Sequence, residues 1–269
     1  MSGYVTPRGL PARTGTLVGR SHTARPPLTH RPPPIAVDLG SAHLRIWLEP
    51  GRVLSAPVGH GLRAPVVRRG RVVDVPACTA ELRRLLRDHR APAPEGALVV
   101  ACRPVLSAPA DQEAARRVLT AVLAPSRLLF VDSVRAGAVG AGAAAGTLLL
   151  ADIGAQLTEV AVLDDGRVVA ARRAEVGTRD LNHAVTSAML ATTVSRLVAE
   201  LRAEPTVRPL VRTALARGVL VVGDGATRPD LTARMVAVLG ATVHRAASPR
   251  TAALTGAGLA ARSALRHPA

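Results

Sequence analysis

The stretch LLADIGAQLTEVAVLDDGRVVAA (149–171) decides the fold because it repeats an earlier stretch, IAVDLGSAHLRIWLEPGRVLSA (35–56). Each begins with apolar residues that end in Asp-x-Gly, continues through a short turn into a second apolar segment, and reaches Gly-Arg-Val. Asp38 corresponds to Asp152 and Gly40 to Gly154. Apolar runs bounded by turn residues favour strands. Each stretch therefore predicts a β-hairpin with an Asp and a Gly at its first turn.

The segments around the two hairpins also follow a similar order. After the first hairpin we expect a helix at 81–89, a strand at 97–102, a helix at 111–124, a strand at 127–132 and a small-residue helix at 133–145. After the second we expect helices at 186–201 and 207–217, a strand opening 219–225, a helix at 231–240, a strand at 241–246 and a small-residue helix at 249–261. Ser248 and Pro249 suit the N-cap and first turn of that last helix.

This order predicts an α/β protein of two related lobes, residues 35–146 and 147–269. Small side chains let two helices cross closely, so the two small-residue helices are expected to pack together between the lobes. Residues 1–34 have many Arg and Pro residues and no acid, which predicts a disordered basic tail.

Composition narrows the possible functions. The chain has 269 residues, of which 48% are hydrophobic and only 1% aromatic, so Ala, Val and Leu must form the core. The net charge is +16 and every basic residue is Arg, which indicates either a coding bias or a basic face for an anionic partner such as a membrane surface. Nucleic acid is the less favoured partner because RNA readers usually add stacking aromatic side chains.

Targeting and metal signals are weak. Two cysteines and eight scattered histidines show no metal-ligand spacing. No signal-peptide core is seen, and the apolar run 136–151 is too short to span a bilayer, so a cytoplasmic location is expected.

Two Asp-x-Gly hairpins that face each other across a cleft can hold a triphosphate. Turn amides point toward phosphates, and Asp38 and Asp152 would hold water around a magnesium ion. A third glycine-rich turn, with Gly223 and Gly225, would lie against the adenosine.

At these motifs the chain resembles the bacterial actins of the MreB and Mbl type, within the actin, heat-shock chaperone and sugar-kinase superfamily. IAVDLGSAHLRIW and DIGAQLTEVAVLDDGRVV resemble the two phosphate motifs, VVGDGATRPDL the adenosine motif, and SPRTAALTGAGLA the closing helix. The resemblance implies a duplicated actin-like, ribonuclease H-like fold that binds ATP and magnesium. The binding residues that it implies are Asp38, Gly40, Ser41, Asp152, Gly154, Gln156, Gly223 and Gly225.

The resemblance also implies a role in cell shape, in which filaments at the inner face of the membrane guide wall synthesis. Its expected partners are further copies of the chain, other MreB-type proteins, and wall-synthesis or membrane proteins.

Several departures from the family pattern predict weak nucleotide binding and loss of efficient hydrolysis. Ala155, Gln156 and Leu157 stand where the family has glycine and threonine, and Asp224 adds a negative charge to the adenosine turn. Asp132 stands where a glutamate would serve hydrolysis, and it is the candidate catalytic acid. Both outer subdomains are expected to be reduced, because few residues separate the inner elements. The alternatives are a small kinase or phosphatase of the same superfamily, and a non-catalytic scaffold that recruits partners.

Overall fold

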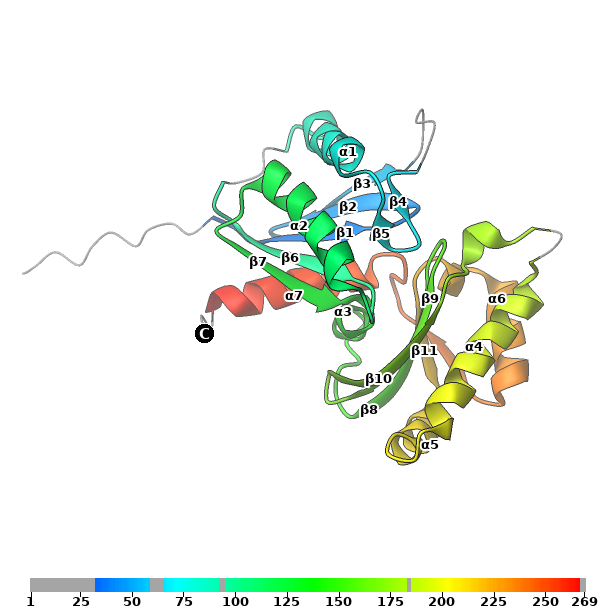
Figure 1. The fold of residues 1–269 in the computed structure, drawn as a ribbon. Coiled ribbons are helices and arrows are strands. Elements are labelled where there is room, and N and C mark those ends of the chain that lie inside the picture. Colours follow the sequence, from blue (N-terminus) through cyan, green and yellow to red (C-terminus); the bar gives the residue numbers. More distant parts are fainter. Residues whose placement is uncertain (1–31, 59–64, 92–94, 183–184, 267–269) are drawn as a thin grey trace, which may run out of the picture. The chain divides into compact units, whose positions relative to one another are not determined.

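The computed structural model describes residues 32–58, 65–91, 95–182 and 185–266. Residues 32–269 form one compact unit, shown in Figure 1. The expected basic tail at 1–34 lies, apart from its last three residues, outside the described part of the chain.

The first sheet has five strands in the order β3-β2-β1-β6-β7. Its first three strands form an antiparallel meander, and β6 and β7 join β1 in parallel. The bounds are β1 Ile35–Leu39, β2 His43–Leu48, β3 Arg52–Pro57, β6 Leu98–Arg103 and β7 Arg127–Asp132.

The second sheet repeats this plan in the order β10-β9-β8-β11-β12. Its strands pair in the same directions, antiparallel for the meander and parallel for the rest. The bounds are β8 Thr147–Ile153, β9 Thr158–Asp164, β10 Arg167–Ala174, β11 Val219–Val222 and β12 Val243–Arg245. The duplicated α/β fold expected from the two hairpins is therefore confirmed.

Helices cover both faces of each sheet (Figure 1). Strand residues alternate between the two faces, so Ile35 and Val37 join one hydrophobic cluster while Ala36 joins another. On the first sheet, α1 (Val75–Asp88) and α2 (Pro109–Leu123) cover one face and α7 (Ala252–Arg266) the other. On the second, α4 (Ser187–Ala203), α5 (Arg208–Arg217) and α6 (Pro229–Leu239) cover one face, and α3 (Ser133–Gly140) the other.

Several helix boundaries differ from the sequence-based expectation, most clearly in α1, α3 and α7. Helix α1 begins six residues earlier, because the Asp74 carboxylate accepts a hydrogen bond from the Ala77 amide at 2.9 Å and caps the helix. Helix α3 ends at Gly140, and the following Gly142 and Gly146 take positive φ values that a helix does not allow. Helix α7 starts at Ala252.

The Ser248-Pro249 pair does not cap α7 as expected. Instead, the Thr251 amide donates to the Ser248 carbonyl at 3.1 Å, which makes a turn before the helix. The Pro249 carbonyl accepts from the Gly223 amide at 2.9 Å, so this turn is tied to the end of β11.

A small two-stranded sheet lies between β3 and α1 in the chain. This is the place of the outer subdomain that the sequence predicts to be reduced. Its strands are β4 (Val67–Arg68) and β5 (Arg71–Val72), joined by Arg69 and Gly70. Both joining residues have positive φ, 50° and 74°, as a two-residue hairpin turn requires.

Helices α3 and α7 cross with their backbones in contact, as expected for the small-residue pair. A Cβ atom on Gly140 would lie 1.9 Å from the Ala252 carbonyl oxygen, and one on Gly256 would lie 1.8 Å from that of Ala136. Both glycines are therefore required by packing.

We expect Gly140→Ala or Gly256→Ala to lower the free energy of unfolding by about 4 kcal/mol or more, because the methyl group would overlap a backbone oxygen. Denaturant unfolding measures the change. Gly137→Ala in the same helix is the control, because its Cβ would lie 3.3 Å from a movable Val222 methyl group, and we expect a change within about 1 kcal/mol. Equal losses in the three variants would contradict the close crossing.

Candidate functional site

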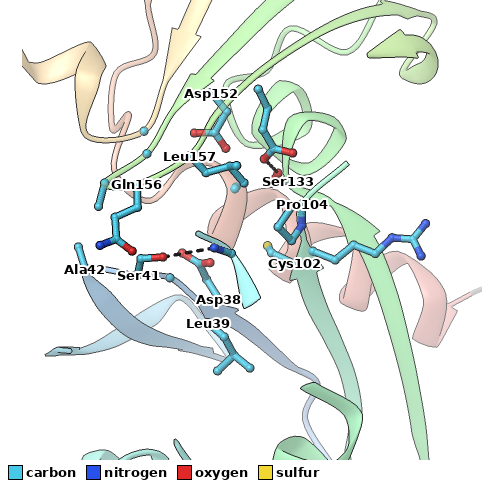
Figure 2. A pocket seen from close by; sticks show the side chains of 18 of the residues that line it. Asp38, Leu39, Ser41, Ala42, Cys102, Pro104, Ser133, Asp152, Gln156 and Leu157 are labelled. Atoms are coloured by element: carbon cyan, nitrogen blue, oxygen red, sulfur yellow. Dashed lines mark hydrogen bonds between the residues drawn. The ribbon is translucent and has the colours of Figure 1, made fainter. Parts of the chain in front are cut away.

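The two repeated hairpins present their first turns to one cavity. The Gly40 amide donates to the His43 carbonyl at 3.0 Å, and the Gly154 amide donates to the Leu157 carbonyl at 2.8 Å, so the two turns close in the same way. Figure 2 shows Asp38 and Ser41 of one turn together with Asp152, Gln156 and Leu157 of the other. The cavity has a volume of about 140 Å³, below the roughly 300 Å³ from which pockets for drug-sized ligands start.

The cavity brings together most of the predicted binding residues. Those that line it are Asp38, Gly40, Ser41, Asp152, Gly154, Gln156 and Gly223. Within the described chain, the lining does not include Asp132 or Gly225.

Asp132 and Gly225 have local structural partners instead. Asp132 lies at the N-cap position of α3, and its Oδ1 accepts from Nε of Arg103 at 2.8 Å. A Cβ on Gly225 would lie 2.5 Å from the Ile153 side chain, so packing accounts for this glycine.

Gly223 joins the third turn to the second hairpin. It has a φ of 82°, and a Cβ there would lie 2.5 Å from Asp152 Oδ1. The turn therefore packs against the hairpin, and Asp224 follows directly at the cavity wall, paired with Arg250 at 3.3 Å.

Asp38 already has a cationic partner in its own hairpin. Arg45 lies opposite it in the β1–β2 register, is buried, and places a guanidinium nitrogen 3.3 Å from the carboxylate. Burial raises the pKa of Asp38, and the Arg45 charge opposes that shift.

The second hairpin carries an acid at the equivalent place. Glu159 lies opposite Asp152 in the β8–β9 register, as Arg45 lies opposite Asp38. It is 4% exposed, accepts from the Val105 amide at 2.6 Å, and accepts from the Ser133 hydroxyl at 2.7 Å.

These acids are shifted toward their protonated forms. Burial, with the neighbouring charges of Asp38 and Asp224, raises the pKa of Asp152 to about 7. Burial and the charge of Asp152 raise the pKa of Glu159 to about 8, against the two hydrogen bonds that it accepts. Asp152 and Glu159 therefore keep their protons to a higher pH than ordinary carboxyl groups do.

Sequence reasoning did not identify Arg45 or Glu159 as site residues. The available signal was the repeat itself, because each lies seven positions after the Asp of its hairpin in an otherwise apolar strand. An ionic residue in an apolar strand of a buried sheet indicates a polar partner inside.

The residues that replace the family's glycines contact another part of the chain. The Arg69 amide donates to Gln156 Oε1 at 3.2 Å, and the Gly70 amide donates to Ser41 Oγ at 3.3 Å. The Leu157 side chain would lie 3.2 Å from a Cβ on Gly70. The tip of the β4–β5 hairpin therefore lies at the cavity, against both turns.

A magnesium triphosphate fits these residues poorly. The Gln156 side chain and the Arg69-Gly70 tip lie at the two turns, and the cavity volume of about 140 Å³ leaves little room for a triphosphate. Among the described residues, no group of three or more His, Cys, Asp or Glu side chains is arranged to hold a metal ion.

Duplicated five-stranded sheets, crossed helices and paired Asp-x-Gly turns at one cavity define an actin-like protein. A family model described as MreB/Mbl protein matches residues 62–207, more than half of the chain. The chain belongs to the MreB/Mbl family.

Solved structures agree with this fold. MreB 5 of Spiroplasma citri bound to AMPPNP is similar with a TM-score of 0.73 and 15% identity, over 87% of this chain and 97% of that one. The MamK double helical filament has a TM-score of 0.69 and 12% identity, over 86% and 99%. The ethanolamine utilization protein EutJ from Carboxydothermus hydrogenoformans has a TM-score of 0.60 and 21% identity, over 85% and 89%. No curated protein matches the chain.

In the described ranges, no helix is both long and apolar enough to cross a bilayer.

The acids at the cavity predict a pH dependence of stability. A raised pKa means that the folded state binds more protons than the unfolded state, so the free energy of unfolding falls as pH rises. For Glu159 this window runs from its ordinary value of 4.5 to about 8. We expect Glu159→Gln to remove a slope of about 1.4 kcal/mol per pH unit there, measured by denaturant unfolding.

The side-chain amide that Glu159→Gln introduces can still accept from the Val105 amide and can donate to the Ser133 hydroxyl, so the variant should fold. Asp88→Asn is the control, because its side chain is 58% exposed at the end of α1, and its pH profile should follow the wild type. Parallel profiles for wild type and Glu159→Gln would contradict the buried, protonated state of Glu159.

Proposed function

We propose that this protein is a divergent MreB-type actin homologue that acts as a self-associating scaffold in cell-shape determination, with a degenerate ATP-binding cleft. The observation that carries the proposal is the content of the cavity. In this member of the family, carboxylates and the contact between Arg69 and Gln156 lie where a nucleoside triphosphate would be expected to bind.

The charge arrangement supports loss of efficient ATP hydrolysis. Asp38 is paired with Arg45, and three further acids approach the cavity from β8, β9 and the third turn. The candidate catalytic acid Asp132 is paired with Arg103, and the described cavity lining does not include it. Hydrolysis requires a closely placed attacking water, and Asp132 does not offer its carboxylate there.

The self-association part rests on the family and the fold. The similar MamK structure is a double helical filament, and its fold covers 86% of this chain. By the same reasoning, the proposed partners are further copies of this chain or other MreB-type proteins, and wall-synthesis or membrane proteins. The net charge of +16 supports a peripheral position on an anionic membrane surface.

Sedimentation at several protein concentrations, with and without Mg-ATP, tests the proposal. We expect concentration-dependent assembly that Mg-ATP leaves unchanged, and phosphate release indistinguishable from a blank. Calorimetry with Mg-ATP should show no binding in the micromolar range.

Asp152→Asn provides the matched control for any nucleotide effect, because it changes only a cavity carboxylate. Assembly that requires ATP and is altered in this variant would refute the degenerate cleft. A monomer at every concentration would refute the scaffold instead. Loss of normal cell width on deletion of the gene tests the cell-shape part separately.

A further inference from the structure

We propose that Ser133 and Glu159 form a nucleophile–base pair that cleaves small, neutral carboxylic esters by acyl transfer. Both residues line the cavity, but neither is among the residues that the family resemblance assigns to nucleotide binding. The inference goes beyond the proposed function and does not depend on whether the protein assembles.

The two side chains make the contact that a nucleophile needs with its base. The Ser133 hydroxyl donates to Glu159 Oε2 at 2.7 Å, and Figure 2 shows Ser133 at the cavity. A separation of about 2.6–3.2 Å between nucleophile and base is the range expected for an activated hydroxyl. Because Ser133 is the donor, the lone pairs of its oxygen remain available for attack.

A third group orients the base. Glu159 is 4% exposed, and its Oε1 accepts from the Val105 amide at 2.6 Å. Arg173 lies opposite Glu159 in the β9–β10 register and donates to the Val105 carbonyl at 3.4 Å. Val105 is thus held through both its carbonyl and its amide, and it holds the carboxylate toward Ser133. Nucleophile, base and orienting group are the three parts of an activated nucleophile.

The surroundings of Glu159 make it a stronger base than an ordinary carboxylate. Burial and the charge of Asp152 on β8 raise its pKa to about 8, against the hydrogen bonds from Ser133 and Val105 and the charge of Arg173 on β10. A general base is most efficient when its pKa lies near the working pH, whereas an ordinary glutamate lies well below it. Above pH 8 the carboxylate is ionised and takes the Ser133 proton.

Cys102 on β6 lines the same cavity but does not compete as a nucleophile. Burial and the neighbouring acids raise its pKa well above the ordinary value. The side chain therefore stays a thiol, which is the unreactive form.

The start of α3 supplies donors for the negative charge that develops on the ester carbonyl. Ser133 is the first residue of this helix, and Asp132 stands at its N-cap position. The Asp132 carboxylate accepts from Nε of Arg103 at 2.8 Å and, within the described chain, makes no capping bond to the helix. N–H groups of the first turn are therefore left without a side-chain acceptor beside the nucleophile, where they stabilise an oxyanion.

The reaction balances with these two side chains and water. Ser133 Oγ attacks the carbonyl carbon while its proton passes to Glu159 Oε2. The carbon–oxygen bond to the alcohol then breaks, and the departing oxygen takes that proton, which leaves acyl-Ser133 and a free alcohol. A water molecule, activated by the same carboxylate, next releases the carboxylic acid and restores the Ser133 hydroxyl.

The cavity favours a short and uncharged acyl group. Its volume of about 140 Å³ is below that of pockets for drug-sized ligands, and Ala101, Phe130 and Ala253 give part of its lining an apolar character. The pair works with Glu159 ionised, and an ionised carboxylate repels a phosphoryl group at contact distance. A neutral ester, such as an acetyl ester, avoids this repulsion.

Acetylation by p-nitrophenyl acetate tests the pair. We expect the wild type to release p-nitrophenol in a burst, and mass spectrometry of the acid-quenched protein should find one acetyl group on Ser133. The chain contains no lysine, so acetylation of lysine side chains does not obscure the result. An acetyl group on Cys102, or none on Ser133, would overturn the proposal.

Two variants and a matched control test the roles of the pair. Ser133→Ala should abolish the burst, and Glu159→Gln should slow it by about a hundredfold or more. Ser107→Ala should match the wild type, because Ser107 also lines the cavity whereas Glu159 bonds to Ser133. The wild-type rate should rise with pH and level off above about 8, and Glu159→Gln should lose this inflection. Equal release by the four proteins would contradict the pair.

The labelling experiment needs no variant, so it decides the proposal even if Ser133→Ala fails to fold. It also separates this inference from the proposed function. Nucleotide binding by the wild type would refute the degenerate cleft, while acetylated Ser133 would still support the pair. Conversely, ATP-independent assembly without acetylation of Ser133 would overturn the pair alone.

Discussion

The backbone contact between α3 and α7 is the constraint on which the rest of the structure depends. Helix α3 follows the last strand of the first sheet and covers the inner face of the second sheet. Helix α7 follows the last strand of the second sheet and covers the inner face of the first. Each half of the chain therefore completes the core of the other half. The crossing is nearly symmetric, with Gly140 against Ala252 and Gly256 against Ala136. Larger residues would separate the helices, and both inner sheet faces would then lose their cover. The distance between the two Asp-x-Gly turns follows from this crossing, because each turn lies at the end of a strand that the helices hold.

The same duplication places chemically opposite residues at equivalent positions. Arg45 and Glu159 occupy one register position in the two hairpins, each across from the Asp of its own turn. In the first hairpin the result is an ion pair, and in the second it is two neighbouring acids with raised pKa values. A fold with two similar halves thus produces one neutralised wall and one acidic wall.

The repeat made the fold predictable from sequence, because Asp-x-Gly turns, strand alternation and small-residue helices are local patterns with a regular period. The site was predictable only in part. Asp38, Ser41, Asp152 and Gln156 meet at one cavity as expected, but their partners come from segments with no periodic signal. The β4–β5 hairpin has two-residue strands, too short for alternation to be recognised. The turn at Ser248 also differs from the local expectation, because a long-range hydrogen bond from Gly223 fixes its geometry.

Two of the residues that depart from the family's glycine-rich turn, Gln156 and Leu157, pack against the β4–β5 hairpin. In the described part of the chain, the only buried side-chain nitrogen or oxygen without a partner is Nε of Arg228, which does not line the cavity. Gln156 and Leu157 have their counterparts in Arg69 and Gly70, and Gly70 in turn tolerates no side chain beside Pro104. Each of these residues is therefore suited to its position by the contact that the others make with it.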